Sequence, residues 1–252
     1  MTTFNDSSSS NGRASESWSS SWTTIRVDRR SRGYCRVTFE HPPINTVTAT
    51  TVGELAELVD LIEQDPELNV VVFSSGNPDF YLAHHDAVYD PGRTAALPQG
   101  PVGMHAWVDL LVRLSRAPVL SIASIRGRIR GAGSEFVLAC DLRFASRENT
   151  LLGRFATGTG VVPGAPVARL SQLVGRGRAL EILLAADDLD GPRAAQYGYV
   201  NRVIADDHLD QEVDEIAARV ARLDHEAIAR TKSSVDPTSP SADSGSRPGR
   251  FL

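Results

Sequence analysis

The hydrophobic and polar positions between Val119 and Ser146 predict a strand, a loop, a helix and a second strand. The run from Val119 to Ile125 is apolar and rich in β-branched residues, which is typical of a buried strand. After it we expect a loop, a short helix and a second strand over Arg126–Gly131, Ala132–Cys140 and Asp141–Ala145. Glu135 lies in the first turn of that helix, where backbone N–H groups lack intrahelical acceptors. The stretch therefore predicts a carboxylate beside a site for a negatively charged oxygen.

Similar patterns recur on both sides of this stretch. Residues 24–28 and 34–39 alternate between polar and apolar side chains and flank a short turn, which predicts a hairpin. A helix capped by Thr48 or Thr50 should run to about Glu63, because apolar residues recur there at helical spacing. Further strands are expected over 70–73 and 200–204, and further helices over 104–114, 167–174, 178–185, 192–197, 208–223 and 227–235. Strands and helices alternate along the chain, so the predicted class is α/β.

The two ends of the chain differ in composition from its centre. Residues 1–21 are rich in Ser, Asn and Gly, and residues 236–252 in Ser, Pro and Gly. We therefore expect disordered tails on either side of one domain at 22–235.

Charge and cysteine usage narrow the class of protein. The formal net charge is −5 and basic residues are not concentrated on one face, which argues against nucleic acid as a partner. No apolar run approaches the roughly 20 residues that span a bilayer, and no signal peptide is visible at the start. The two cysteines are far apart and do not form a disulfide framework. We expect a cytoplasmic protein that contacts no membrane.

Five blocks of sequence, taken in order, carry a resemblance to a known family. They are a strand followed by Asn45 and NVVVFSSG, the segment from Phe80 to Asp86, APVLSIASIRGRIRGAGSEFVLACDLRFAS, GVVPG with LVGRGRALE, and AAQYGYVNRVI. In this order and spacing they resemble the crotonase family, also called the enoyl-CoA hydratase/isomerase family, over about residues 24–235. The resemblance implies an α/β fold built as a spiral of β-β-α repeats, here with a shortened carboxyl-terminal helical region. It also implies a homotrimer or a hexamer.

The resemblance implies chemistry on an acyl-CoA thioester through an enolate, with coenzyme A as part of the substrate and no permanently bound cofactor. Two backbone N–H donors would stabilise the enolate oxygen, and by position they fall on Ala83 and Ala132. Glu135 matches the first of the two glutamates of a hydratase and would be the main acid/base. The second glutamate falls on Ala156, so this chain is an atypical member that lacks one of the two carboxylates.

The loop that ends at Asp86 departs from the family pattern. His84 stands where the family usually has glycine, and His84 and His85 bring two imidazoles near the reacting centre, where either is a candidate acid or base. The substrate is expected to contact five residues: Ala83, His84, His85, Asp86 and Ala132. A metal site is not expected, because nothing elsewhere in the sequence marks a partner ligand for the H-x-D pattern.

More than one function is compatible with these residues. The first is an acyl-CoA enzyme of the hydratase/isomerase kind, a lyase or an isomerase in fatty acid metabolism. Because Ala156 removes one acid, one-base chemistry such as C–C hydrolysis or decarboxylation in a biosynthetic pathway is an alternative. Another is a catalytically reduced homologue that binds a thioester or a partner protein without turnover. An acyl carrier protein thioester is an alternative substrate.

Overall fold

The structure is a computed structural model that describes residues 18, 22–86, 92–153, 166–185 and 187–235. Its strands are β1 Ile25–Ser31, β2 Tyr34–Phe39, β3 Val70–Ser75, β4 Phe80–Leu82, β5 Leu120–Ile129, β6 Leu142–Leu152, β7 Leu189–Asp190 and β8 Arg202–Ile204. Its α-helices are α1 Ala49–Gln64, α2 Ala106–Arg116, α3 Ala132–Ala139, α4 Pro166–Val174, α5 Arg176–Leu180, α6 Gly191–Tyr197, α7 Leu209–Val220 and α8 His225–Val235. A π-helical turn, Glu181–Ala185, follows α5, and a 3₁₀ turn, Asp206–His208, precedes α7. The predicted disordered tails lie outside the described residues, apart from Trp18.

All the described strands belong to one mixed sheet. The main path runs β1-β2-β3-β5-β6-β7, while β4 pairs with β5 and β8 pairs with β6. The pair β1 and β2 is the expected antiparallel hairpin, and β2, β3, β5 and β6 then run parallel. Helices connect these parallel strands, as parallel pairing requires. The α/β class expected from the sequence is confirmed.

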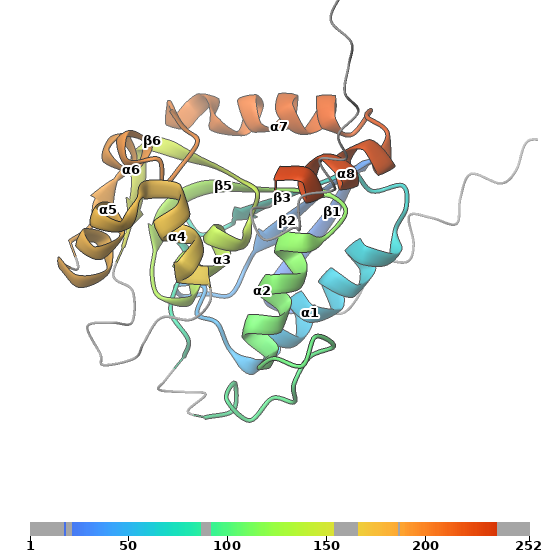
Figure 1. Ribbon diagram of the computed structural model, residues 1–252, viewed down its shortest axis with the longest axis horizontal. Helices are drawn as coiled ribbons and strands as arrows, with labels where there is room; N and C mark the ends of the chain where they lie inside the picture. The colour runs from blue at the N-terminus through green and yellow to red at the C-terminus, as the bar shows by residue number, and fades with distance from the viewer. Residues whose placement is uncertain (1–17, 19–21, 87–91, 154–165, 186, 236–252) are drawn as a thin grey trace, which may run out of the picture.

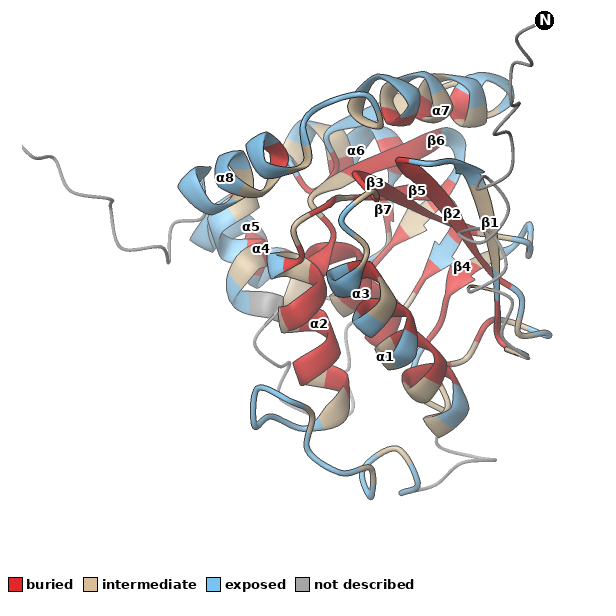
Figure 2. Ribbon diagram, turned by 90° about the vertical axis from the view of Figure 1, so that its right-hand side faces the viewer, coloured by how far each residue is buried: buried red, intermediate tan, exposed pale blue. Residues whose placement is uncertain are grey.

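The sheet lies between two layers of helices (Figure 1). The larger core packs α1, α2, α3 and α4 against one face, and it contains the alternating β2 residues Cys35, Val37 and Phe39. The smaller core packs α7 against the other face, around Val70, Val72 and Ile122. Figure 2 shows buried residues concentrated on the strands and on the inward sides of α1 and α2, with α8 largely exposed. None of the helices in the described ranges is long and apolar enough to span a membrane.

Two strands are longer than the sequence pattern predicts. A loop was expected from Arg126, but β5 continues to Ile129, and β6 continues to Leu152 rather than ending at Ala145. The pairing of β5 with β6 shifts register after Ile125 and then resumes. Gly127 makes this irregularity possible, because its φ is +74° and a Cβ there would lie 2.7 Å from the carbonyl oxygen of Asp79. A bulge of this kind breaks the polar-apolar alternation by which strands are predicted.

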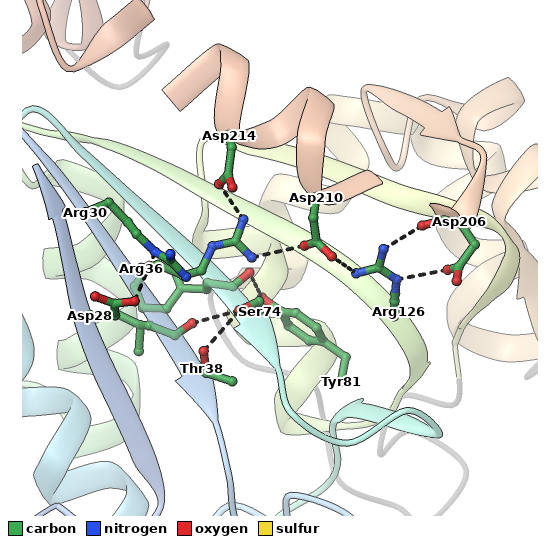
Figure 3. Close-up of polar contacts among 12 residues, drawn as sticks. Asp28, Arg30, Arg36, Thr38, Ser74, Tyr81, Arg126, Asp206, Asp210 and Asp214 are labelled. Carbon is green, nitrogen blue, oxygen red and sulfur yellow. Dashed lines mark hydrogen bonds and ion pairs between the residues drawn. The ribbon is translucent and has the colours of Figure 1, made fainter. Parts of the chain in front are cut away.

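Ion pairs hold α7 onto the sheet (Figure 3). Arg36 on β2 is mostly buried and places its guanidinium 2.6 Å from Asp214 and 3.1 Å from Asp210. Arg126 on β5 lies 2.7 Å from Asp210 and 3.0 Å from Asp206. Since the two arginines share Asp210, they join two strands and the start of α7 in one network. This network occupies the face of the sheet opposite to α3.

Candidate active site

The start of α3 lies directly against the loop that follows β4. The N–H of Gly133 donates to the carbonyl oxygen of Ala83 over 3.0 Å, and the N–H of Arg130 donates to Leu82 over 3.2 Å. A Cβ on Gly133 would lie 2.7 Å from the carbonyl carbon of Leu82 and closer still to its oxygen. Only a residue without a side chain permits this approach of helix to strand. The sequence therefore brings Glu135, in the same first turn of α3, close to the loop.

Asn45 fixes the other side of the same loop. Its side chain is buried and its Nδ2 donates to Ser75 Oγ over 2.9 Å and to the Tyr81 carbonyl over 3.1 Å. Its own carbonyl accepts from the N–H of Ala83 over 2.9 Å. With a φ of 53°, Asn45 adopts the left-handed region, which asparagine tolerates better than most residues. Asn45 thereby ties the end of β3, β4 and the loop together.

The orientation of two peptide groups determines which N–H groups of the loop face away from these contacts. A trans peptide holds its C=O and N–H on opposite sides. The carbonyl of His84 accepts from Val47 N–H over 3.0 Å, so the N–H of His85, in the same peptide, points away from Val47. The carbonyl of Ala83 accepts from Gly133 N–H, so the N–H of His84 points away from α3.

The N–H of His84, which points away from α3, has no acceptor among the described residues. The same holds for the N–H of His85 in the loop and for the N–H of Ala132, the first residue of α3. The loop and the helix touch between them, since a Cβ on Gly131 would lie 3.0 Å from His84 Cβ. The N–H of Ala83, expected from the sequence to be a donor to substrate, is instead used by Asn45. In this structure the N–H of Ala83 has an acceptor within the chain and that of Ala132 has none among the described residues, and the roles of both stay predictions.

Glu135 is half-buried and is held by a tryptophan from the neighbouring helix. The Nε1–H of Trp107, near the start of α2, donates to Glu135 Oε2 over 2.7 Å, a length typical of a hydrogen bond to an ionised acceptor. Trp107 is itself only 3% exposed and belongs to the larger core. Trp107 falls within the helix predicted over 104–114, and helical spacing carries no signal that an indole N–H will meet a carboxylate.

The two histidines of the loop have different surroundings. His84 is exposed, whereas His85 is partly buried and meets the Trp107 ring edge-to-face at 5.2 Å between centroids. Burial lowers the pKa of His85 below its ordinary value, so its imidazole is neutral at pH 7. Its Nδ1 is buried and has no hydrogen-bond partner among the described residues. Trp107 thus contacts both Glu135 and His85.

Other predicted features lie elsewhere or outside the described residues. Ala156, the position of the absent second glutamate, falls in the range 154–165 that the structure does not describe. Cys35 and Cys140 are free and buried, and burial raises the pKa of each thiol to about 12. Within the described ranges, His, Cys, Asp and Glu side chains form no group of three that could hold a metal ion.

A polar cleft adjoins the loop at Asp86. Its volume is about 350 Å³. It is lined by Thr23, Thr24, His41, Pro42, Pro43, Thr46, Thr48, Thr50, Asp86 and Arg93. Asp86 follows His85 directly and is anchored by its own N–H, which donates to the carbonyl of Val47 over 3.0 Å. The cleft therefore reaches the loop at Asp86, one residue after His85, while His85, Ala132 and Glu135 are not part of its lining.

Comparison with known proteins gives a consistent result. The family model described as Enoyl-CoA hydratase/isomerase matches residues 29–246. A crotonyl-CoA hydratase from Syntrophomonas wolfei subsp. wolfei is 28% identical over 196 residues, covering 77% of this chain and 74% of that protein. A crystal structure described as a candidate enoyl-CoA hydratase from Streptomyces avermitilis is 40% identical, with a TM-score of 0.80, covering 88% of this chain and 81% of that chain. DspI from Pseudomonas aeruginosa is 26% identical, with a TM-score of 0.75, covering 86% of this chain and 88% of that chain.

Proposed function

Because this chain belongs to the enoyl-CoA hydratase/isomerase family, we propose that it moves a proton on an acyl-CoA thioester through an enolate intermediate. Glu135 is the acid/base in this proposal, and the N–H groups of His85 and Ala132 are the donors to the enolate oxygen. The substrate is bound as its coenzyme A thioester, and the reaction needs no permanently bound cofactor.

One observation carries the proposal: the N–H groups of His85 and Ala132, which no described residue engages, and the Glu135 carboxylate belong to one junction of the loop with α3. Negative charge develops on the thioester oxygen as the neighbouring carbon loses its proton, and backbone donors fixed beforehand stabilise that charge. Ala132 supplies its N–H from a helix N-terminus, which also favours negative charge. Glu135 lies in the same first turn of that helix, where its carboxylate can take the proton.

The neighbouring cleft supports the thioester as the substrate class. It begins at Asp86, next to the proposed donor His85, and His41 and Arg93 contribute cationic or hydrogen-bonding groups to its lining. Such groups suit the phosphates of coenzyme A, for which arginine is a preferred partner. We place the nucleotide end of the substrate in this cleft and its thioester at the start of α3.

The number of acid/base groups points to a reaction with one proton-transferring carboxylate. Ala156 has no ionisable side chain, so of the two glutamate positions of a hydratase this chain keeps a carboxylate only at Glu135. Shift of a double bond, or exchange of the proton next to the thioester, can proceed with Glu135 alone. Addition of water needs one group to activate the water and another to protonate carbon. We therefore propose isomerisation or proton exchange ahead of hydration.

The experiment is deuterium incorporation into acyl-CoA thioesters in D₂O, followed by mass spectrometry. A panel that varies chain length and double-bond position is incubated with the protein and with Glu135→Gln. We expect deuterium at the carbon next to the carbonyl, or two carbons further along, and a rate lowered by about 10²–10⁴ in the variant. The matched control is Glu57→Gln, because Glu57 also accepts from an indole, that of Trp22 over 2.8 Å, but is exposed and lies on α1.

The outcomes separate the proposal from its alternatives. Exchange that is lost in Glu135→Gln and kept in Glu57→Gln supports it. Binding of thioesters without exchange supports a homologue that binds without turnover. Exchange that survives in Glu135→Gln refutes Glu135 as the acid/base.

A further inference from the structure

Trp107 connects the two halves of the candidate site through contacts of different kinds. Its indole N–H donates to Glu135 Oε2 over 2.7 Å, and the same ring packs edge-to-face on His85 with an interplanar angle of 80°. One rigid side chain, 3% exposed, therefore touches both the proposed acid/base and the residue whose N–H is a proposed donor.

The hydrogen bond to Trp107 restricts the side chain of Glu135. A glutamate has three rotatable bonds, and a half-buried carboxylate that samples several rotamers spends little time in the orientation that proton transfer needs. The indole cannot follow such motion, because the larger core surrounds it and α2 holds its backbone. The bond therefore fixes the position of Oε2 and stabilises the ionised form of the carboxyl group.

We propose that Trp107 is a positioning residue, which orients Glu135 and keeps it ionised for proton abstraction while holding His85 in place. The inference rests on the proposed function and adds a residue that itself does not transfer a proton. The indole N–H acts through the carboxylate, and the ring acts through its contact with the loop.

The chain provides its own matched control for this hydrogen bond. Trp22 Nε1 donates to Glu57 Oε2 over 2.8 Å, the same pair of groups at nearly the same distance. That pair joins the segment before β1 to α1 and is exposed. Trp22→Phe and Trp107→Phe thus delete the same donor, and only the second deletion lies at the site.

The test compares the two variants in the deuterium-exchange assay across pH. For Trp107→Phe we expect kcat to fall about ten- to a hundredfold, the range for a lost hydrogen bond to a charged group. We expect KM to change less than about threefold, and the acid limb of the rate profile to move to higher pH. The direction follows because a carboxylate that has lost a donor is protonated more easily. Trp22→Phe should leave all three quantities unchanged.

A second measurement does not depend on activity or on the stability of the variant. The indole Hε1 signal of Trp107 in a ¹H–¹⁵N spectrum, assigned by its absence in Trp107→Phe or by its response to Glu135→Gln, should move with pH in the wild-type protein. In Glu135→Gln the part of that response that follows the carboxylate should vanish, and only a response to the neighbouring His85 imidazole should remain.

Each outcome bears on one claim. If the wild type exchanges deuterium and Trp107→Phe does so with the same rate and pH profile, the positioning role is overturned and the proposed function stands. An indole signal that responds neither to pH nor to Glu135→Gln also overturns it. A wild-type protein that exchanges no thioester overturns the proposed function, and with it any role of Trp107 in proton transfer, even where the indole signal titrates.

Discussion

Replacing Gly133 by alanine tests whether the close approach of α3 to β4 creates the site. The added Cβ would lie 2.7 Å from the carbonyl carbon of Leu82, whereas carbon atoms in contact are normally about 3.5–4.0 Å apart. The start of α3 must therefore move away from β4 by roughly 1 Å. Since Gly133 also donates to Ala83 over 3.0 Å, the same movement strains the bond that aligns the loop with the helix.

The expected loss of activity follows from the displacement of the donors. Oxyanion donors act at about 2.7–3.1 Å from their oxygen, and a 1 Å misplacement costs on the order of 10²-fold in rate. We expect Gly133→Ala to exchange deuterium about a hundredfold more slowly than the wild type. Gly53→Ala is the control: in α1 a Cβ meets nothing within 4 Å, so it should gain about 0.5–1 kcal/mol of stability with unchanged activity.

The assay combines exchange rates with thermal unfolding of each variant. A folded Gly133→Ala protein that exchanges within about threefold of the wild-type rate would refute the reasoning. In that case the donors of the loop and of α3 do not act at one oxygen, and the proposed assignment of His85 and Ala132 fails.

Two further predictions concern stability. Burial lowers the folded-state pKa of His85. Below the unfolded value of about 6.5 the unfolded chain therefore binds the proton first, and the free energy of unfolding falls as the pH drops. In urea unfolding between pH 6.5 and 5, His85→Gln should lose stability less steeply than the wild type, and an equally steep loss contradicts the burial argument. Lys232 on α8 lies 2.8 Å from Asp141 Oδ2 and donates to Val119 O over 2.7 Å, with both charged side chains 14% exposed. Lys232→Met should cost about 2 kcal/mol in urea unfolding because it leaves Asp141 without its cation; a change below about 0.5 kcal/mol would show that the pair is solvated.

Local signals in the sequence were sufficient for much of the fold. Thr48 caps α1 as expected, and Asp190 caps α6, which ends at Gly198 in the left-handed conformation. These features depend on neighbours within one turn of helix, so they are visible in the order of residues. The extension of β5 past Arg126 depends on a bulge at Gly127, which only the pairing with β6 reveals.

The candidate site was predictable in its position and less so in its detail. The sequence located Glu135 and Ala132 at the start of one helix, since both lie within four residues of each other. It could not show that Ala83 gives its N–H to Asn45, because that bond depends on the path of a distant segment with a positive φ. It also gave no sign that Trp107 reaches Glu135 from another helix.

The role of Asn45 has a consequence for how the molecule acquires its activity. Its side-chain amide meets Ser75, Phe80 and Tyr81, which are 30, 35 and 36 residues further along the chain. Contacts at such sequence separation form only after the entropy of closing long loops has been overcome. The donor loop therefore has no shape of its own before the sheet has assembled, and a fragment or a partly folded chain cannot present it. Turnover during refolding should accordingly appear last, together with the final native contacts.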